Sequence, residues 1–293
     1  MEYLFLAIFI IVCTGQSLFC RLYSNHYPGD PDASSSVFSM ISGFVVLLVA
    51  LIMCGFDFAP KPMTLLIGFL NGIALIVYNA MMVKASNKGP FSVQMVCALA
   101  GGILVPAFIN LARGTEKLSL LQWIAVAIVI VSIVMISLKK DDQKITNFSF
   151  FIFCAGLFLF NGLYGALLNV QQEETGVGDK EEMIVITYGV AVLVSLIEAL
   201  IKRRKKFASD FRQTKKSALF LLICALATAT SVNLLVALID MMPDTTVLYT
   251  FDNAGVLLFS VISACIFFRE KLSALNAVGC LTLGAGLIMI SVF

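Results

Sequence analysis

The sequence predicts an all-α integral membrane protein in which ten transmembrane helices form two inverted five-helix repeats. Apolar residues make up 60% of the chain and charged residues only 13%, and the mean hydropathy is +0.97. The apolar runs are about 20 residues long, which is the length a helix needs to cross a bilayer. Lipid admits only helices or closed barrels, and these runs are too long and continuous for barrel strands.

The second half of the chain repeats the first. A shift of 154 positions places the tetrapeptide Glu-Lys-Leu-Ser at 270–273 on the same tetrapeptide at 116–119, and Gly255 on Gly101. A shift of 147 positions places Gly15 on Gly162, and the extra length of the linker 202–215 over its counterpart 55–61 accounts for the difference. A repeat at a fixed offset indicates the fold before any motif does. We therefore expect one five-helix repeat over 1–144 and a second over 145–293.

The expected spans begin after Pro, Gly or polar residues, which suit loops and helix N-termini. They are 2–23, 34–54, 62–84, 89–112, 118–138, 147–170, 182–201, 216–239, 244–268 and 271–292. The first run lacks a signal-peptide pattern, so we expect it to be retained. An odd number of spans per half gives the halves opposite orientations, and such repeats hold a substrate between them near the bilayer midplane.

Lysine and arginine predict the orientation. Sixteen of the 20 lie in the loops after spans 1, 3, 5, 7 and 9. The positive-inside rule makes this face cytoplasmic and places both termini outside, in a multi-pass protein of the plasma or inner membrane. We interpret the basic run 202–206 as part of this orientation signal and expect no nucleic-acid partner.

Several kinds of chemistry find no support. The eight cysteines lie almost wholly in apolar runs and act as small apolar residues, and the one histidine, His26, lies in a loop. Neither a metal cluster nor a Ser/His/Asp set can be assembled, and no Gly-x-x-x-x-Gly-Lys phosphate loop occurs. The sequence therefore favours a protein that is not an enzyme and that uses no metal or cofactor.

Asp252 is the main candidate for a functional group. It lies eight residues into span 9, at a depth of roughly 12 Å, with no Lys or Arg at the same depth of any span. A charge there costs at least ~2.5–3.5 kcal/mol on insertion scales, so such residues tend to face the interior and to have a function. A proton or a cationic group of the substrate could neutralise it, which makes Asp252 the predicted coupling residue. The alternative is a carboxylate that only holds helices together by hydrogen bonds.

Other polar residues inside the spans are predicted to bind substrate together with Asp252. They are Asn253, Tyr249, Asn79, Asn233, Asn161, Tyr164, Gln16, Asn71, Tyr78 and Gln94. Asn79 and Asn233 occupy matching positions of the two repeats, and amides suit a polar solute. For each of these residues the alternative is interhelical hydrogen bonding.

Two further expectations concern the last helices of the halves. Glu116 and Glu270 precede these helices, and we expect them to cap the helix N-termini. Spans 5 and 10 contain few polar groups, so we expect them to lie at the periphery or at a dimer interface.

Ten spans in two halves, each with a Glu-Lys-Leu-Ser turn, and a Gly-rich last helix (Gly279, Gly284, Gly286) resemble the drug/metabolite transporter superfamily, in particular its EamA-like permeases. The resemblance implies a carrier of small metabolites, amino acids or drugs. Two features depart from it. Members usually have cytoplasmic termini, and the four-span small multidrug resistance relatives carry a glutamate midway along span 1, where Ile10 to Thr14 has no carboxylate.

We therefore expect a secondary transporter of small organic metabolites, including amino acids or amine-bearing compounds, that works by alternating access around a midplane site. Its partners are the small-molecule substrate and the lipid bilayer, and it is a monomer or a homodimer. The alternatives are an intramembrane enzyme, for which the sequence offers no reactive set of residues, and a membrane scaffold or receptor that transports nothing.

Overall fold

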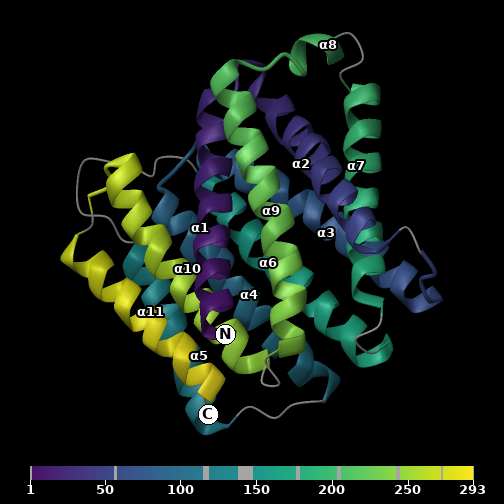
Figure 1. Ribbon diagram of the computed structural model, residues 1–293. Coiled ribbons are helices and arrows are strands. Elements are labelled where there is room, and N and C mark those ends of the chain that lie inside the picture. Colours follow the sequence, from purple (N-terminus) through teal and green to yellow (C-terminus); the bar gives the residue numbers. More distant parts are fainter. Residues whose placement is uncertain are drawn as a thin grey trace.

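The computed structural model is a bundle of helices (Figure 1). It describes residues 2–55, 58–114, 119–137, 148–175, 179–202, 206–241, 245–271 and 273–292, and within these residues there are eleven helices and no strand. The helices are α1 (Glu2–His26), α2 (Pro31–Met53), α3 (Pro62–Ser86), α4 (Phe91–Arg113), α5 (Leu120–Ser137), α6 (Phe148–Thr175), α7 (Lys180–Lys202), α8 (Phe207–Asp210), α9 (Lys215–Met241), α10 (Thr245–Phe268) and α11 (Ala274–Val292).

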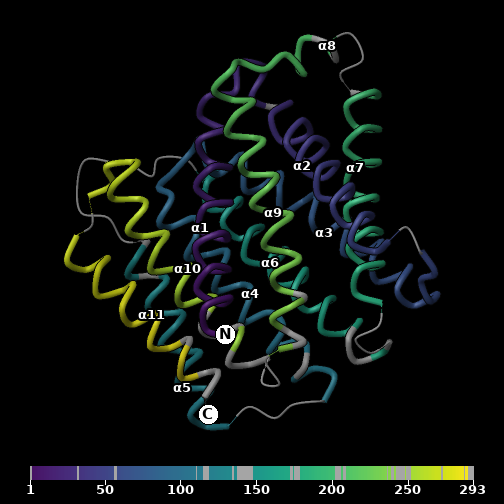
Figure 2. Tube along the Cα trace, in the orientation of Figure 1, coloured from purple at the N-terminus to yellow at the C-terminus, as the bar shows by residue number. Residues whose placement is uncertain are grey.

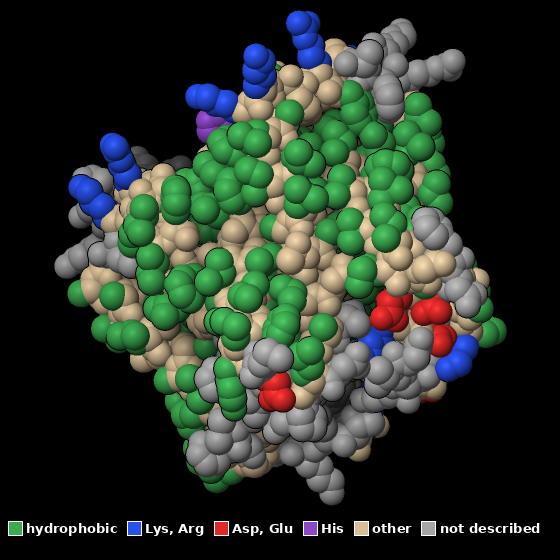
Figure 3. All heavy atoms as spheres, in the orientation of Figure 1, with side chains coloured by type: hydrophobic (Ala, Val, Ile, Leu, Met, Phe, Trp, Pro, Cys, Tyr) green, Lys and Arg blue, Asp and Glu red, His purple; other side chains and the backbone are tan. Residues whose placement is uncertain are grey.

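The surface is that of a multi-pass membrane protein. Seven helices (α1, α2, α3, α4, α6, α7 and α9) are long and apolar enough to cross a membrane, and α5, α10 and α11 contain shorter apolar stretches. A broad apolar surface covers the face shown in Figure 3, and large side chains such as Leu4, Ile52 and Leu281 are more than 60% exposed. A soluble monomer rarely exposes so much apolar surface, whereas a lipid-embedded one must.

The charged side chains separate toward opposite ends of the bundle. Figure 1 shows α8 at the end opposite both chain termini, and we call this end the α8 end. On the face shown in Figure 3, Lys and Arg side chains gather mainly toward the α8 end and Asp and Glu toward the other. This distribution matches the loop asymmetry of the sequence.

The helices differ from the predicted spans mainly at their ends. α1 continues to His26 and α6 to Thr175, beyond the expected ends at 23 and 170. In these extensions Ser24 and Gln171 are buried, whereas Asn25, His26 and Glu174 are exposed, so polar residues continue each helix beyond its apolar run. The linker 202–215 contains the short helix α8. Residues 116–118 of the first Glu-Lys-Leu-Ser turn, residue 272 of the second and residues 203–205 of the basic run lie outside the described residues.

Two helices, α1 and α6, each pack between two others. α1 packs between α9 and α10, and α6 packs between α3 and α4. α2 packs against α7, and α5 packs against α11 at one side of the bundle (Figure 2). The hydroxyls of Ser132 and Thr282 are 2.8 Å apart in the α5–α11 contact, and Asn276 donates to the carbonyl of Ile136 at 2.7 Å. As expected, α5 and α11 are peripheral.

The tightest helix contact is the crossing of α4 and α6. A Cβ atom added at Gly101 would lie 1.9 Å from the carbonyl oxygen of Phe158, and one added at Gly162 would lie 2.4 Å from the carbonyl oxygen of Gly101. The obstructing atoms belong to the backbone and cannot move aside as a flexible side chain can. Glycine at these positions therefore permits backbone-to-backbone contact between the two helices.

A buried carboxylate joins the N-terminal ends of α3 and α7. Asp179 precedes α7, and its Oδ2 accepts hydrogen bonds from Thr64 Oγ1 at 2.9 Å and from the N–H of Lys61 at 3.2 Å. Lys61 Nζ lies 3.5 Å from the other carboxylate oxygen. Burial would raise the pKa of Asp179, but the hydrogen bonds from Thr64 and Lys61 and the charge of Lys61 outweigh it, so the pKa lies below its ordinary value.

Replacement of Gly101 by alanine should destabilise the protein strongly, because the added methyl group meets backbone rather than movable side chains. Overpacking a core lined by side chains costs about 1–3 kcal/mol, and a backbone obstruction should cost more. Gly284→Ala is the matched control, since a Cβ there meets nothing within 4 Å. Thermal unfolding in detergent measures both variants, and equal melting temperatures would contradict the backbone contact.

Asp179→Asn should lower the melting temperature at neutral pH, because the amide carries no charge for Lys61 or for the N-terminus of α3. The pKa of Asp179 is lower in the folded than in the unfolded state, so its stabilisation is present above the unfolded value of about 3.9 and is lost as the pH falls through the folded value. The difference in melting temperature between wild type and variant should therefore be constant from about pH 8 to pH 5 and shrink at lower pH. A difference independent of pH would show that the charge is not involved.

Candidate functional site

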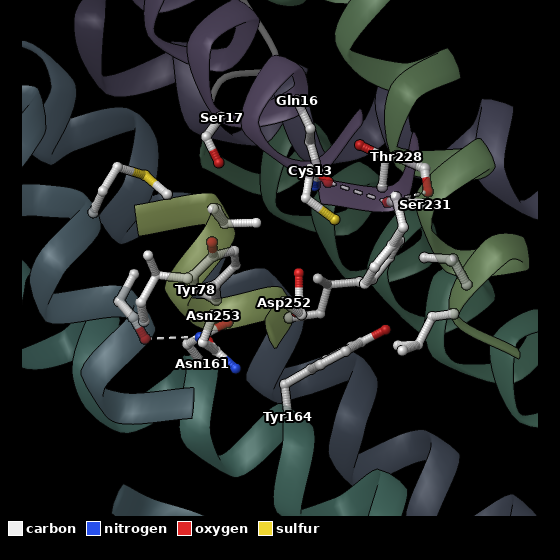
Figure 4. A pocket seen from close by; sticks show the side chains of 18 of the residues that line it. Cys13, Gln16, Ser17, Tyr78, Asn161, Tyr164, Thr228, Ser231, Asp252 and Asn253 are labelled. Carbon is white, nitrogen blue, oxygen red and sulfur yellow. Dashed lines mark hydrogen bonds between the residues drawn. The ribbon is translucent and has the colours of Figure 1, made fainter. Parts of the chain in front are cut away.

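A polar cavity of about 200 Å³ lies inside the bundle. Its lining comes from α1, α3, α4, α6, α7, α9 and α10, so both halves of the chain contribute; no lining residue among those described comes from α5 or α11. The polar lining residues are Cys13, Gln16, Ser17, Tyr78, Asn161, Tyr164, Tyr188, Thr228, Ser231, Asp252 and Asn253. We call this cavity the central pocket (Figure 4).

Asp252 brings a carboxylate to the middle of the pocket. It lies seven residues after the first residue of α10, and Figure 4 shows it between Cys13 of α1 and Tyr164 of α6. Its Oδ1 is buried and has no hydrogen-bond partner among the described residues. No Lys, Arg or His is among the described residues that line the pocket. The need of this carboxylate for a counter-charge or a donor is therefore not met by the described part of the chain.

Several hydrogen-bond donors of the pocket are used by helix backbones. Thr228 Oγ1 donates to the carbonyl of Cys224 at 2.8 Å, and Ser231 Oγ donates to the carbonyl of Thr228 at 2.9 Å. Asn161 Nδ2 of α6 donates to the carbonyl of Ala98 in α4 at 2.8 Å. Serine and threonine commonly bond back to their own helix in this way. These three donors are therefore engaged by carbonyls of the helix backbones.

Aromatic side chains complete the lining. Tyr78, Tyr164 and Tyr188 come from three different helices, α3, α6 and α7, and Phe9 comes from α1. The side chains of Tyr164 and Tyr188 are within hydrogen-bond reach of each other. Three tyrosines around one carboxylate give the pocket electron-rich surfaces as well as phenolic oxygens.

The structure brings part of the predicted set together. Asp252, Asn253, Asn161, Tyr164, Gln16 and Tyr78 all line the central pocket. Asn161 and Tyr164 share a helix face, as their spacing predicts. The described lining does not include Asn79, which is half-buried beside Tyr78. The side chain of Tyr249 lies outside the described residues.

Three predicted residues lie elsewhere, in helix contacts. Gln94 donates to the carbonyl of Met82 at 2.9 Å and so ties α4 to α3. Asn71 is buried in α3 beside Gly72, at the contact with α7, and neither polar atom of its amide has a partner among the described residues. Asn233 donates to the carbonyl of Ala229 at 2.8 Å and lines a separate groove between α2 and α9. It is two residues past Ser231, and this spacing turns it by roughly 200° away from the pocket.

Five polar residues of the lining are absent from the set predicted from the sequence, namely Cys13, Ser17, Tyr188, Thr228 and Ser231. The internal repeat could have indicated some of these additional pocket residues. The offset of 147 places Ser17 on Tyr164, and the offset of 154 places Ala98 and Leu99 on Asp252 and Asn253; all of these line the pocket. Equivalent positions in the two halves thus face the same cavity even where their residue types differ. Tyr188 has no such signal, because its counterpart, Ile41, does not line the pocket.

A buried ion pair lies beyond the lining of the pocket toward the α8 end. Arg21 lies one turn beyond Ser17 on α1, and its Nη2 is 3.5 Å from Glu270 Oε1. The side chains are only 11% and 8% exposed. The guanidinium also lies over the ring of Phe268, 4.4 Å from its centroid, and over that of Phe91 at 5.5 Å. Its Nε and Nη1 are buried without hydrogen-bond partners among the described residues.

Glu270 caps α4 instead of the last helix, contrary to expectation. Its carboxylate accepts hydrogen bonds from the N–H groups of Phe91 at 2.5 Å and Ser92 at 3.2 Å, and from Ser92 Oγ at 2.8 Å. These N–H groups belong to the first turn of α4 and have no acceptor within that helix. The last helix begins only at Ala274, where Ser273 and Asn276 bond to each other reciprocally as a cap. Three intervening residues carry Glu270 too far from that helix.

Comparisons with known proteins give the fold alone. No protein-family model matches the chain, and no curated protein sequence matches it. A solved structure described as "Crystal structure of protein" is similar, with a TM-score of 0.61 and 13% sequence identity over 95% of this chain and 94% of that one. The arrangement of helices thus occurs in another protein chain of similar extent, although only 13% of the residues are identical.

Glu270→Gln should destabilise the protein by more than the loss of an exposed ion pair would, because it leaves the Arg21 guanidinium buried without a counter-charge. Breaking a buried pair at one partner typically costs about 3–5 kcal/mol. The double variant Arg21→Gln, Glu270→Gln removes both charges and should recover part of the loss. The single variant Arg21→Gln completes the cycle, and the melting temperatures of wild type and the three variants give the coupling. Additive losses would show that the ion pair does not act as a unit.

Proposed function

We propose that this protein is a secondary transporter that moves a small organic solute by alternating access. The observation that carries the proposal is the central pocket, in which helices from both halves surround a carboxylate oxygen of Asp252 that has no hydrogen-bond partner among the described residues. Ionisable groups inside membranes are costly and mark substrate or proton pathways. A pocket formed at the contact of two helical units also suits a binding site that opens alternately to each side.

The helix contacts support two repeats with ten spans. In the proposed repeats, α1 corresponds to α6, α2 to α7, α3 to α9, α4 to α10 and α5 to α11. The contact between α1 and α9 then corresponds to that between α6 and α3, and the contact between α1 and α10 to that between α6 and α4. The contact between α2 and α9 corresponds to that between α7 and α3, and all of these contacts occur. The α2–α7, α4–α10 and α5–α11 contacts map onto themselves. The shortest of the ten helices, α5, has 18 residues and a length of about 27 Å, close to the ~30 Å hydrocarbon core.

The two ends of the bundle support a transporter held in one state. At the α8 end, α1 and the turn after α10 are joined by the buried pair Arg21–Glu270. The same correspondence relates these helices to α6 and α4, which are joined near the opposite end by Arg113 and Glu174 at 3.8 Å, with side chains 33% and 47% exposed. Equivalent helix pairs are thus joined by a buried ion pair at one end and by a more exposed ion pair at the other. We infer a conformation closed at the α8 end.

The family assignment is part of this proposal. The two Glu-Lys-Leu-Ser turns and the corresponding helix contacts support a place among the EamA-like permeases of the drug/metabolite transporter superfamily. The fold likeness to a solved structure over 95% of the chain is compatible with it. The basic residues at the α8 end favour a cytoplasmic α8 end in the plasma or inner membrane.

The transport proposal predicts solute counterflow in proteoliposomes, tested with a panel of small amines, amino acids and organic acids. Asp252→Asn keeps the size of the side chain but removes its charge, so we expect counterflow to be lost while the protein remains folded. Asn233→Ala is the matched control, because Asn233 lies outside the central pocket, and it should transport as the wild type does. Turnover of a solute without flux would point to an enzyme, and counterflow in Asp252→Asn equal to wild type would reduce Asp252 to a structural role.

A further inference from the structure

We propose that the central pocket selects a small organic cation that has no carboxylate of its own. The cation would be held by Asp252 and by the tyrosine side chains around it. This inference rests on the proposed function only for the movement of the solute, because binding to the pocket can be measured without transport.

Charge is the first reason. The pocket holds one carboxylate, and its described lining has no cationic side chain. The charged residue one turn beyond the lining on α1 is Arg21, which is committed to Glu270 and to the ring of Phe268. An ammonium group in the pocket would therefore meet its counter-charge. The carboxylate of a zwitterionic amino acid would face Asp252 without a cation to balance it, and like charges at a desolvated site repel strongly.

Hydrogen bonding is the second reason. A bound carboxylate needs N–H or O–H donors, but the hydroxyls of Thr228 and Ser231 and an N–H of Asn161 are directed to helix carbonyls. Oxygen acceptors remain, among them the unpartnered Oδ1 of Asp252. An ammonium or guanidinium group offers donors and no acceptors. A cation would thus find acceptors in the lining, whereas three of the donors that a bound carboxylate could use are already engaged.

Aromatic side chains and size are the third reason. The rings of Tyr78, Tyr164 and Tyr188 line the cavity from three helices, and the faces of such rings attract cations, most strongly in desolvated sites. The cavity volume of about 200 Å³ is below the range of roughly 300–1,000 Å³ typical of drug-sized ligands, and a cavity of about 150 Å³ suffices for benzene. These dimensions favour a solute of fewer than about ten non-hydrogen atoms.

Two matched pairs of probes test the inference. Choline and glycine betaine share a quaternary ammonium group, but only glycine betaine has a carboxylate. Isobutylamine and valine share a side chain and an amine, but only valine has a carboxylate. Binding is measured by thermal stabilisation of the full-length protein in detergent, since a ligand that binds the folded state raises the melting temperature. We expect stabilisation by choline or isobutylamine and none by its carboxylate-bearing partner.

Variants assign the effect to the pocket. Asp252→Asn should weaken cation binding by about thirty-fold or more, as expected for loss of one partner of a desolvated charge pair. Tyr164→Phe keeps the aromatic ring and should bind more tightly than Tyr164→Leu, which removes it. Asn233→Ala should bind as the wild type does, because this residue lies in the separate groove between α2 and α9.

The outcomes separate this inference from the transport proposal. Stabilisation by a cation that Asp252→Asn abolishes, without counterflow of that cation, would support the cation site and overturn transport. Counterflow or stabilisation by valine or glycine betaine equal to that of the matched cation would overturn the cation selectivity and leave transport standing. Absence of stabilisation by all four probes at millimolar concentration would also overturn the cation site.

Discussion

A polar group inside a lipid-embedded bundle must find its partner within the protein, and this constraint organises the molecule around Asp252. Thr228 and Ser231 donate to carbonyls of their own helix, and Asn161 donates to a carbonyl of α4. An ionised carboxylate has no proton to donate to a backbone carbonyl. Oδ1 of Asp252 accordingly has no hydrogen-bond partner among the described residues, at the point where helices of both halves meet.

Two other carboxylates with little exposed surface, those of Glu270 and Asp179, have hydrogen-bond partners and join the two halves of the chain. Glu270 and Asp179 both belong to the second half, and both accept backbone N–H groups at the N-terminus of a first-half helix, α4 and α3 respectively. A helix N-terminus presents donors and a partial positive charge, so it offsets the desolvation of a carboxylate without a second charged residue. Glu270 takes on Arg21 in addition. By contrast, Oδ1 of Asp252 is buried and has no hydrogen-bond partner among the described residues.

Backbone contact at the α4–α6 crossing sets the geometry on which the pocket depends. Gly101 and Gly162 let the two helices touch, and one turn further Asn161 reaches the carbonyl of Ala98. The glycine contact brings the backbones of α4 and α6 together beside the pocket. The Arg21–Glu270 pair is a contact of another kind, because it joins α1 to the turn after α10 through side chains alone.

Sequence alone determined the helical membrane character and the approximate helix positions, and it made Asp252 the main candidate, because hydropathy and the cost of a buried charge are properties of composition and position along a helix. Tertiary structure decided which polar residues share the cavity, because the rotation of each helix about its axis is set by packing. Gln94 and Asn71 are as polar as Asn161, yet they face helix contacts while Asn161 faces the pocket. Tyr188 lines the pocket, and Glu270 accepts hydrogen bonds from the N-terminus of α4. Both depend on contacts between residues far apart in the chain, which no local sequence pattern encodes.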